Sequence, residues 1–234
     1  MGNKLLVNKN FFQEWSPAMA YVLGFWFADG SVERSIAIRG HYVRVGSTEL
    51  EIISYIKRQL SAEHKIHKTL RPAQKNYYLL RIGDKHMFDE LVALGVVERK
   101  SRTALFPKVP KKFLSHFIRG YFDGDGCVYL EKSKDGSYKR LTTVFTSGSI
   151  NFLTQLRIVL AREIHTPFTK KISTTRSGAG ATAFQLRYSS RDSLKLYSFL
   201  YKNVNDAFYL KRKHASFKTF MRAKDIENTL SVQY

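Results

Sequence analysis

Two aspartates, Asp29 and Asp125, each precede a glycine at the end of a stretch rich in apolar and aromatic residues. The first stretch reads YVLGFWFADGSV at 21–32, and the second reads FIRGYFDGDGCV at 117–128, with an offset of 96. Carboxylates are disfavoured at helix C-termini, where the dipole is negative, and they repel each other when they are neighbours. A divalent cation offsets both penalties, and oxygen-only ligation with open positions suits Mg²⁺ or Mn²⁺. The matched pair therefore predicts a metal site, whereas a single Asp-Gly would indicate only a helix stop and a hairpin turn.

Very small residues recur four positions apart in both stretches. They are Gly24 and Ala28 in the first and Gly120 and Gly124 in the second, and this spacing places each pair on one helix face. Glycine inside a helix costs about 1 kcal/mol relative to alanine, so a helix pair in backbone contact is a reason to tolerate it. We expect that contact to bring the two carboxylates together. The bulky neighbours should point outward into two separate cores: Leu23, Phe25, Trp26, Phe27, Ile118, Tyr121 and Phe122.

Further blocks repeat in the same order along the chain. VGSTELEIISYIKRQL at 45–60 aligns without gaps on FTSGSINFLTQLRIVL at 145–160, and both predict a helix introduced by Ser or Thr capping residues. The offset has grown from 96 to 100, as an enlarged hairpin would make it. LLRIGDK at 79–85 then matches QLRYSSR at 185–191, and ERKSRTALF matches YLKRKHASF. Four matched blocks in one order indicate an internal repeat rather than a chance likeness of composition.

Each repeat reads as a helix, two strands, a helix, two strands and a helix. Alternation predicts antiparallel sheets with one face on a core, for example Ile66, Leu70, Leu80 and Ile82 inward against Lys65, His67, Arg71 and Arg81 outward. Two prolines in FPKVPK divide the chain into an N-terminal repeat at 1–108 and a C-terminal repeat at 109–234. The expected strands are 31–39, 42–47, 65–71 and 76–83, then 127–133, 139–147, 168–175 and 183–189.

The composition indicates a polyanionic partner. The 234 residues include 39 Lys and Arg against 19 Asp and Glu, a net charge of +20 spread along the whole length. Of the two plausible polyanions, nucleic acid is favoured over a membrane, because no apolar run is long enough to span a bilayer. The N-terminus lacks a secretory signal, so we expect an intracellular protein. With a single cysteine, Cys127, a thiolate metal cage is excluded, and the sequence has no HExxH, GxxxxGK[ST] or GxSxG motif.

VLGFWFADG and IRGYFDGDG resemble the two LAGLIDADG motifs of monomeric homing endonucleases, and the resemblance covers essentially the whole chain. It implies an α+β fold of two pseudo-symmetric αββαββα repeats, with saddle-shaped antiparallel sheets joined through two central LAGLIDADG helices. It also implies a metal-dependent double-strand DNA endonuclease that cuts across the minor groove and leaves 3′ extensions. The earlier acid of the motif is Asp123 in the second repeat but Phe27 in the first, a departure that spares the metal ligand.

The resemblance also implies roles for individual residues. Asp29 and Asp125 would bind the metal, Mg²⁺ with Mn²⁺ as a substitute, and the carbonyls of Ala28 and Gly124 are possible further ligands.

A lysine at the start of the last helix of each repeat lies near the water network in this family, which points to Lys100 and Lys211. Such a lysine could stabilise charge on the attacked phosphate, although a solvated surface lysine is the alternative for each. A polar residue at the end of the second strand completes the site in relatives. Here it would be Glu49 in one repeat and Ser149 or Gly148 in the other, so the two DNA strands would not be cut by identical machinery.

The sheets are expected to enter the major groove, where base pairs carry a full hydrogen-bonding code. Arginine pairs with guanine and glutamine with adenine, but each such side chain can instead contact phosphate. Because the two sets of exposed residues differ, the target should be long and asymmetric and bound by a monomer with internal pseudo-two-fold symmetry. We expect DNA contacts from Arg39, Tyr42, Arg44, Lys65, His67, Tyr77 and Arg81 in the first repeat, and from Tyr129, Glu131, Arg140, Thr142, Lys171, Gln185 and Arg187 in the second.

Two other functions fit the same scaffold: a maturase that binds intron RNA, and a DNA-binding regulator without catalysis. A regulator need not keep both acids and both lysines, whereas a maturase could keep them. The chain begins MGNK and ends SVQY, so we expect no intein splicing block.

Overall fold

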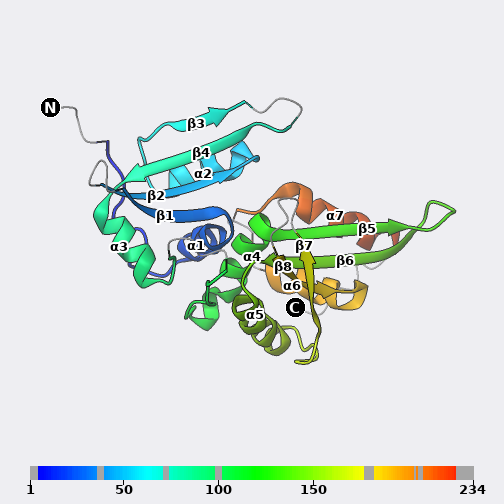
Figure 1. Cartoon of the computed structure of the whole chain (residues 1–234). Coiled ribbons are helices and arrows are strands. Elements are labelled where there is room, and N and C mark those ends of the chain that lie inside the picture. The colour runs from blue at the N-terminus through cyan, green and yellow to red at the C-terminus, as the bar shows by residue number, and fades with distance from the viewer. Residues whose placement is uncertain are drawn as a thin grey trace. The chain divides into compact units, whose positions relative to one another are not determined.

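The computed structural model describes residues 5–35, 40–70, 74–97, 102–176, 182–202, 204 and 208–224. The chain forms two compact units, Met1–Gly124 and Asp125–Tyr234. The expected α+β architecture is confirmed, with a four-stranded antiparallel sheet and covering helices in each unit (Figure 1). These units follow packing rather than sequence repetition, and the division of the repeats at residue 108 stays a prediction.

In the first unit, helix α1 (Pro17–Asp29) leads directly into a sheet of strand order β1-β2-β4-β3. Val43, Val45, Leu80 and Ile82 are buried and alternate with more exposed side chains, so one sheet face builds the core against α1, α2 and α3 and the other is open. The further elements are β1 (Gly30–Ser35), β2 (Gly40–Ser47), α2 (Leu50–Gln59), β3 (Ile66–Thr69), β4 (Tyr77–Gly83), α3 (Lys85–Ala93), a 3₁₀ turn (Lys111–Phe113) and α4 (Leu114–Asp125), whose last residue begins the second unit.

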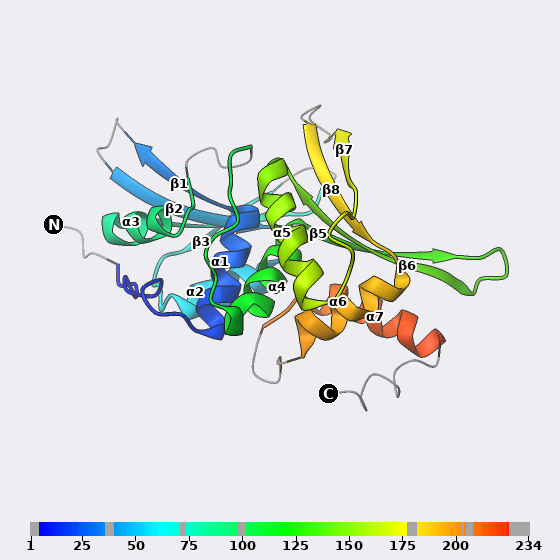
Figure 2. The same ribbon diagram turned by 90° about the horizontal axis from the view of Figure 1, so that it is seen from below.

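The second unit follows the same plan, with strand order β5-β6-β8-β7. Its β5–β6 hairpin projects beyond the helices of this unit (Figure 2), and β6 has ten residues where β2 has eight. This length fits the larger sequence offset after the hairpin. The elements are β5 (Gly126–Lys132), β6 (Tyr138–Ser147), α5 (Ile150–Glu163), β7 (Ile172–Arg176), β8 (Thr182–Tyr188), α6 (Ser190–Tyr201) and α7 (Lys211–Ala223).

The repeat is visible in single hydrogen bonds. Ser47 Oγ accepts a bond from the Glu49 amide, and Ser147 Oγ accepts one from the Ser149 amide, each at 3.1 Å. The next helices, α2 and α5, begin one residue later in both units. Each of these positions in the second unit lies 100 residues after its counterpart in the first unit. The gapless alignment predicted from the sequence is therefore confirmed at these positions.

Helices α1 and α4 meet through their glycines, as the small-residue spacing predicted. A methyl group at Gly24 would overlap the carbonyl oxygen of Phe117, and one at Gly120 would overlap the carbonyl oxygen of Tyr21. The same two methyl groups would lie 3.0 Å from the Tyr121 nitrogen and 2.9 Å from the Phe25 nitrogen. Only glycine permits this backbone approach.

Two expectations about apolar side chains were wrong. Leu70 is 71% exposed instead of inward, because β3 ends at Thr69 and no longer sets the direction of its side chain. Phe27 is buried, but its ring meets Phe117 of α4 with centroids 5.5 Å apart. It therefore packs at the helix pair rather than away from it.

Polar groups are also buried where α1 meets α4. Tyr21 Oη donates to Asp123 Oδ2 at 2.8 Å, so the earlier motif acid is held by the partner helix. Arg119 Nη2 donates to His116 Nδ1 at 2.9 Å, and both side chains are nearly inaccessible. Since a guanidinium can only donate, this bond requires a neutral imidazole with its proton on Nε2.

This neutral histidine predicts a pH dependence of stability. Burial, with a smaller contribution from the Arg119 charge, lowers the pKa of His116 from its usual 6.5 to about 4. Between these values the unfolded chain binds more protons, so stability is fully present above pH 6.5 and is lost as the pH falls toward 4. We expect urea unfolding to show a loss on the order of 2 kcal/mol from this group between pH 7.5 and pH 4.5. His116→Gln should flatten that part of the profile, and an unchanged slope would contradict the assignment.

Candidate functional site

Asp29 is carried at a direct junction between a helix and a strand. Ser16 caps α1 through a 3.0 Å bond to the Met19 amide, and the helix then stays buried over Met19–Phe27. Asp29 is exposed, and Gly30 begins β1 without an intervening turn. A methyl group at Gly30 would overlap the Trp26 ring, so this glycine provides space for the indole. Asp29 therefore does mark a helix stop, but a strand follows it directly instead of a hairpin turn.

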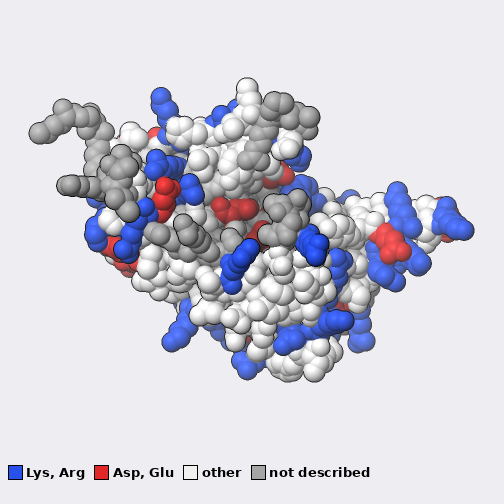
Figure 3. Space-filling view, viewed as in Figure 1, with Lys and Arg blue, Asp and Glu red and all other residues white. Residues whose placement is uncertain are grey.

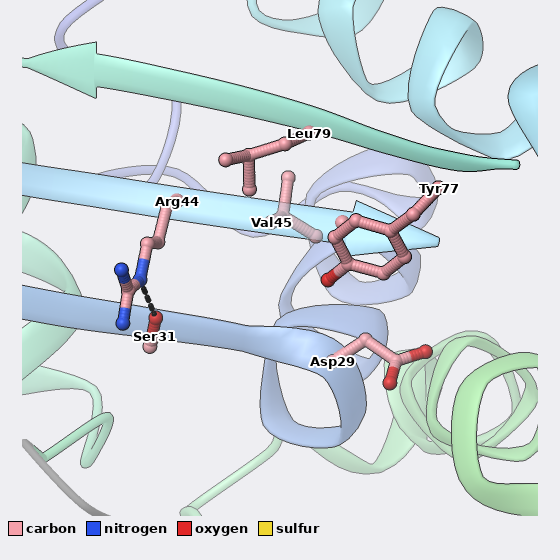
Figure 4. A pocket seen from close by; sticks show the side chains of 7 residues that line it. Asp29, Ser31, Arg44, Val45, Tyr77 and Leu79 are labelled. Carbon is pink, nitrogen blue, oxygen red and sulfur yellow. Dashed lines mark hydrogen bonds between the residues drawn. The ribbon is translucent and has the colours of Figure 1, made fainter. Parts of the chain in front are cut away.

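A cavity of about 260 Å³ opens beside Asp29 on the open face of the first sheet. Tyr77 covers Gly46, where a methyl group would lie 2.6 Å from Tyr77 Cζ, so the missing side chain of Gly46 makes room for the ring. Figure 4 shows the Tyr77 hydroxyl on the side of the Asp29 carboxylate. The lining residues are Asp29, Ser31, Arg44, Val45, Gly46, Tyr77 and Leu79.

The end of α4 approaches Asp29 through another glycine. A methyl group at Gly124 would meet the Ala28 side chain and lie 3.1 Å from Asp29 Oδ2. Asp125, the next residue of α4, is half-buried. Among the described residues, no three His, Cys, Asp or Glu side chains are grouped to hold a metal. Metal binding by the two aspartates stays a prediction, as do the carbonyl ligands at Ala28 and Gly124.

The roles expected of Lys100 and Lys211 stay predictions. Lys100 lies outside the described residues, and Lys211 is the exposed first residue of α7. Lys213, which the sequence interpretation did not select, is 3% exposed, and its Nζ donates to the carbonyl oxygen of Gly126 at 2.6 Å. The signal that was overlooked is the Arg-Lys dipeptide, present at 99–100 and again at 212–213. Matching these dipeptides pairs Lys100 with Lys213, whereas matching ERKSRTALF with YLKRKHASF pairs it with Lys211.

The polar residues after the second strand of each sheet take different positions. Glu49 precedes α2 without capping it and lies 3.9 Å from Lys75 Nζ, but it does not line the Asp29 cavity. Ser149 is buried and caps α5 through a 3.2 Å bond to the Phe152 amide. Gly148 is half-buried. A catalytic role for Glu49 stays a prediction.

The open sheet faces carry the residues expected to contact DNA. Strand register places Tyr42, Arg44, His67, Tyr77 and Arg81 on one face of the first sheet. Lys65 and Lys171 are exposed just before β3 and β7, and Arg39 lies outside the described residues. In the second sheet the matching face carries Tyr129, Glu131, Arg140, Thr142, Gln185 and Arg187.

Several of these side chains are already held in place. The Arg81 guanidinium lies 3.7 Å from the centre of the Tyr42 ring, and Arg187 Nη2 donates to Gln185 Oε1 at 2.5 Å. Figure 3 shows Lys and Arg along the projecting β5–β6 hairpin around an acidic patch. There Glu131 lies 3.8 Å from both Lys139 and Arg140. Contact with DNA stays a prediction for every one of them.

The family model described as LAGLIDADG-like domain matches residues 16–91 and 112–199, and the chain therefore belongs to this family. A protein of Methanocaldococcus jannaschii described as probable translation initiation factor IF-2 is 24% identical over 204 residues, 82% of this chain. One of the same description from Thermococcus kodakarensis is 26% identical over 157 residues, 64% of this chain. The chain spans only 16% and 12% of the lengths of these two relatives.

Solved structures share the fold. The homing endonuclease I-GzeII in complex with its DNA target has a TM-score of 0.59 at 11% identity, with 92% of each chain covered. I-SmaMI bound to cleaved DNA has a TM-score of 0.58 at 15% identity, covering 94% of this chain and 92% of its own. The fold is therefore that of LAGLIDADG homing endonucleases. Across the described part of the chain, every helix is too short or too polar to cross a membrane.

Proposed function

We propose that this protein is a site-specific double-strand DNA endonuclease that hydrolyses phosphodiesters with a divalent metal. The observation that carries the proposal is the packing of α1 on α4. It sets Gly124, the residue before Asp125, against the carboxylate of Asp29. Membership of the LAGLIDADG-like family and a net charge of +20 support the same function.

Asp29 and Asp125 would hold Mg²⁺, with Mn²⁺ as a substitute, and the carbonyls of Ala28 and Gly124 would add further ligands. The donor set fits because all these ligand atoms are oxygens, and Gly124 has no side chain to obstruct Asp29 Oδ2. The cation would supply charge stabilisation for the attacking and leaving oxygens of the phosphodiester. The protein's own contribution is to hold both carboxylates on paired, buried helices and to leave a cavity beside Asp29.

The DNA would be cut across the minor groove with 3′ extensions, while the open sheet faces enter the major groove on either side. Each face offers a different set of side chains, such as Arg44 in the first sheet where the matching residue of the second is Val144. A monomer with internal pseudo-two-fold symmetry would therefore recognise a long site without a palindrome.

The decisive experiment is incubation with a randomised duplex library and Mg²⁺, followed by sequencing of the cut ends. Sequence-defined, staggered breaks with 3′ extensions are expected. Tight duplex binding without breaks in Mg²⁺ or Mn²⁺ would instead identify a regulator, and selective binding of intron RNA would identify a maturase.

We further propose that Lys213 stabilises charge on the phosphate beside the second acid, because its ammonium is held at the Gly126 carbonyl, one residue after Asp125. Lys213→Met should lower the single-turnover cleavage rate roughly 100-fold, the effect of removing one positioned charge donor. Lys211→Met is the matched control on the same helix. Because Lys211 is exposed, its removal should change the cleavage rate less than about fivefold, since an exposed charge contributes at most about 1 kcal/mol. If Lys211→Met lowered the cleavage rate more than Lys213→Met, the stabilisation of charge on the phosphate would be assigned to Lys211 instead.

A further inference from the structure

Arg44 is held in one orientation by two side chains of the neighbouring strand. On the open face of the first sheet it pairs in register with Ser31 of β1. Its Nε donates to Ser31 Oγ at 2.8 Å (Figure 4), and its Nη1 lies 3.2 Å from Glu33 Oε2 in an ion pair. The Arg44 side chain is nevertheless 47% exposed. Its guanidinium is therefore oriented before any ligand arrives.

A second cation faces it across the sheet. Arg44 and Arg81 are directly opposite each other in the register of β2 and β4, an arrangement that is normally destabilising for like charges. Glu33 offsets part of this repulsion from one side, and the Tyr42 ring holds Arg81 from the other. Two arginines kept side by side on an open face favour a ligand rich in hydrogen-bond acceptors.

The Glu33 carboxylate distinguishes between the two acceptors that DNA offers. A carboxylate 3.2 Å from the guanidinium repels an approaching phosphate, but it is compatible with a neutral base edge. The Arg44 Nε hydrogen is bound to Ser31 Oγ, and Nη1 is held near Glu33 by an ion pair rather than a hydrogen bond, so the Nη1 and Nη2 hydrogens remain for a ligand. Two parallel N–H groups match the O6 and N7 acceptors of guanine in the major groove.

Resting on the proposed endonuclease function, we propose that Arg44 reads one guanine in the half-site bound by the first sheet, with Glu33 and Ser31 as its positioning residues. Arg44 and Asp29 line the same cavity, so this guanine lies close to the bond that is cut. The matching residue of the second sheet, at an offset of 100, is Val144, which is 1% exposed. The Arg44 contact therefore has no counterpart at the matching position of the second sheet, and this difference makes the target asymmetric near its centre.

The test compares base preferences in two selections from the same randomised duplex library, one for cleavage in Mg²⁺ and one for binding in EDTA. Arg44→Met should relax a guanine preference at a single position by roughly 5- to 100-fold. Glu33→Ala should weaken the preference at the same position while strengthening binding to all sequences, because a negative charge is removed. Glu33→Gln should keep more of the preference than Glu33→Ala, since it keeps the length of the side chain and a polar oxygen beside the Arg44 guanidinium. The control Arg191→Met, which changes an exposed arginine of α6 outside the expected DNA contacts, should leave this position unchanged.

A phosphate contact predicts different results. Arg44→Met would then weaken binding evenly across sequences and reduce the salt dependence of log Kd by about one. Glu33→Ala would tighten binding without altering any base preference, and either pattern would overturn the proposal. If the variants cleaved DNA in Mg²⁺ with the same base preferences as the wild type, the guanine contact would be rejected and the endonuclease function would stand. Guanine selection in EDTA without cleavage in Mg²⁺ would reject the endonuclease function and keep the contact.

Discussion

Asp29→Asn and Asp125→Asn should each abolish metal-dependent cleavage while leaving binding to DNA intact. An asparagine keeps the shape of the side chain but removes the charge that holds a divalent cation. Metal-assisted charge stabilisation supplies several kcal/mol, so we expect single-turnover rates to fall by roughly 100- to 10,000-fold. Affinity for the selected duplex should stay equal or rise, because a negative charge beside phosphate is lost. The substrate is a plasmid that carries a site recovered from the library.

Stability measurements separate this effect from misfolding. Asp29 is exposed at a helix C-terminus, where a carboxylate is disfavoured, so Asp29→Asn should stay within about 1 kcal/mol of the wild-type stability. Asp89→Asn removes another exposed acid, one that pairs with Lys85 at 2.6 Å on α3, and it should cleave at the normal rate. Normal cleavage by both motif variants would refute the metal site.

Gly24→Ala and Gly120→Ala should each destabilise the fold by about 2–4 kcal/mol, the range of a severe overpacking defect. Either methyl group would overlap a backbone carbonyl of the opposite helix, which cannot rotate away as a side chain can. The two helices would have to separate and lose contact along a buried surface. Helix propensity alone predicts the opposite sign, a gain of about 1 kcal/mol for each alanine. The free energy of unfolding, measured with urea at pH 7.5, distinguishes the loss expected from overpacking from the gain expected from helix propensity.

Gly136→Ala is the matched control for these helix variants. Gly136 lies in the turn of the β5–β6 hairpin with φ +84°, and a methyl group there would meet nothing within 4 Å. Its cost should be only about 1–2 kcal/mol, from the left-handed backbone conformation. If Gly24→Ala and Gly120→Ala proved as stable as the wild type or more stable, the close approach of α1 and α4 would be wrong.

Features that depend on local periodicity could be predicted from the sequence. The strands were placed within a few residues, because buried and open positions alternate along each sheet, and the gapless repeat gave α2 and α5 matched starts. The glycine spacing likewise predicted the contact between α1 and α4, since close backbone approach requires residues without a bulky side chain.

Features that depend on packing between distant segments were missed. The burial of Lys213 follows from the position of α7 against β5, 87 residues away in the sequence. The Glu33–Arg44 ion pair depends on the register of β1 with β2, which alternation alone does not define. Leu70 was misplaced for a related reason, because the alternation continues past the point where β3 stops pairing at Thr69.

In the proposed enzyme, the junction between α1 and β1 would join the catalytic acid to the surface that recognises DNA. Asp29 ends the helix and Gly30 begins the strand, with Trp26 packed on the joint, so no flexible linker separates the carboxylate from the sheet. Ser31, the next residue, already belongs to the group that holds Arg44. A mismatched base pair that displaced this strand would move the acid with it. In the proposed enzyme, errors in the target would therefore slow the cutting step itself as well as loosen the complex, so fidelity would exceed what binding strength alone provides.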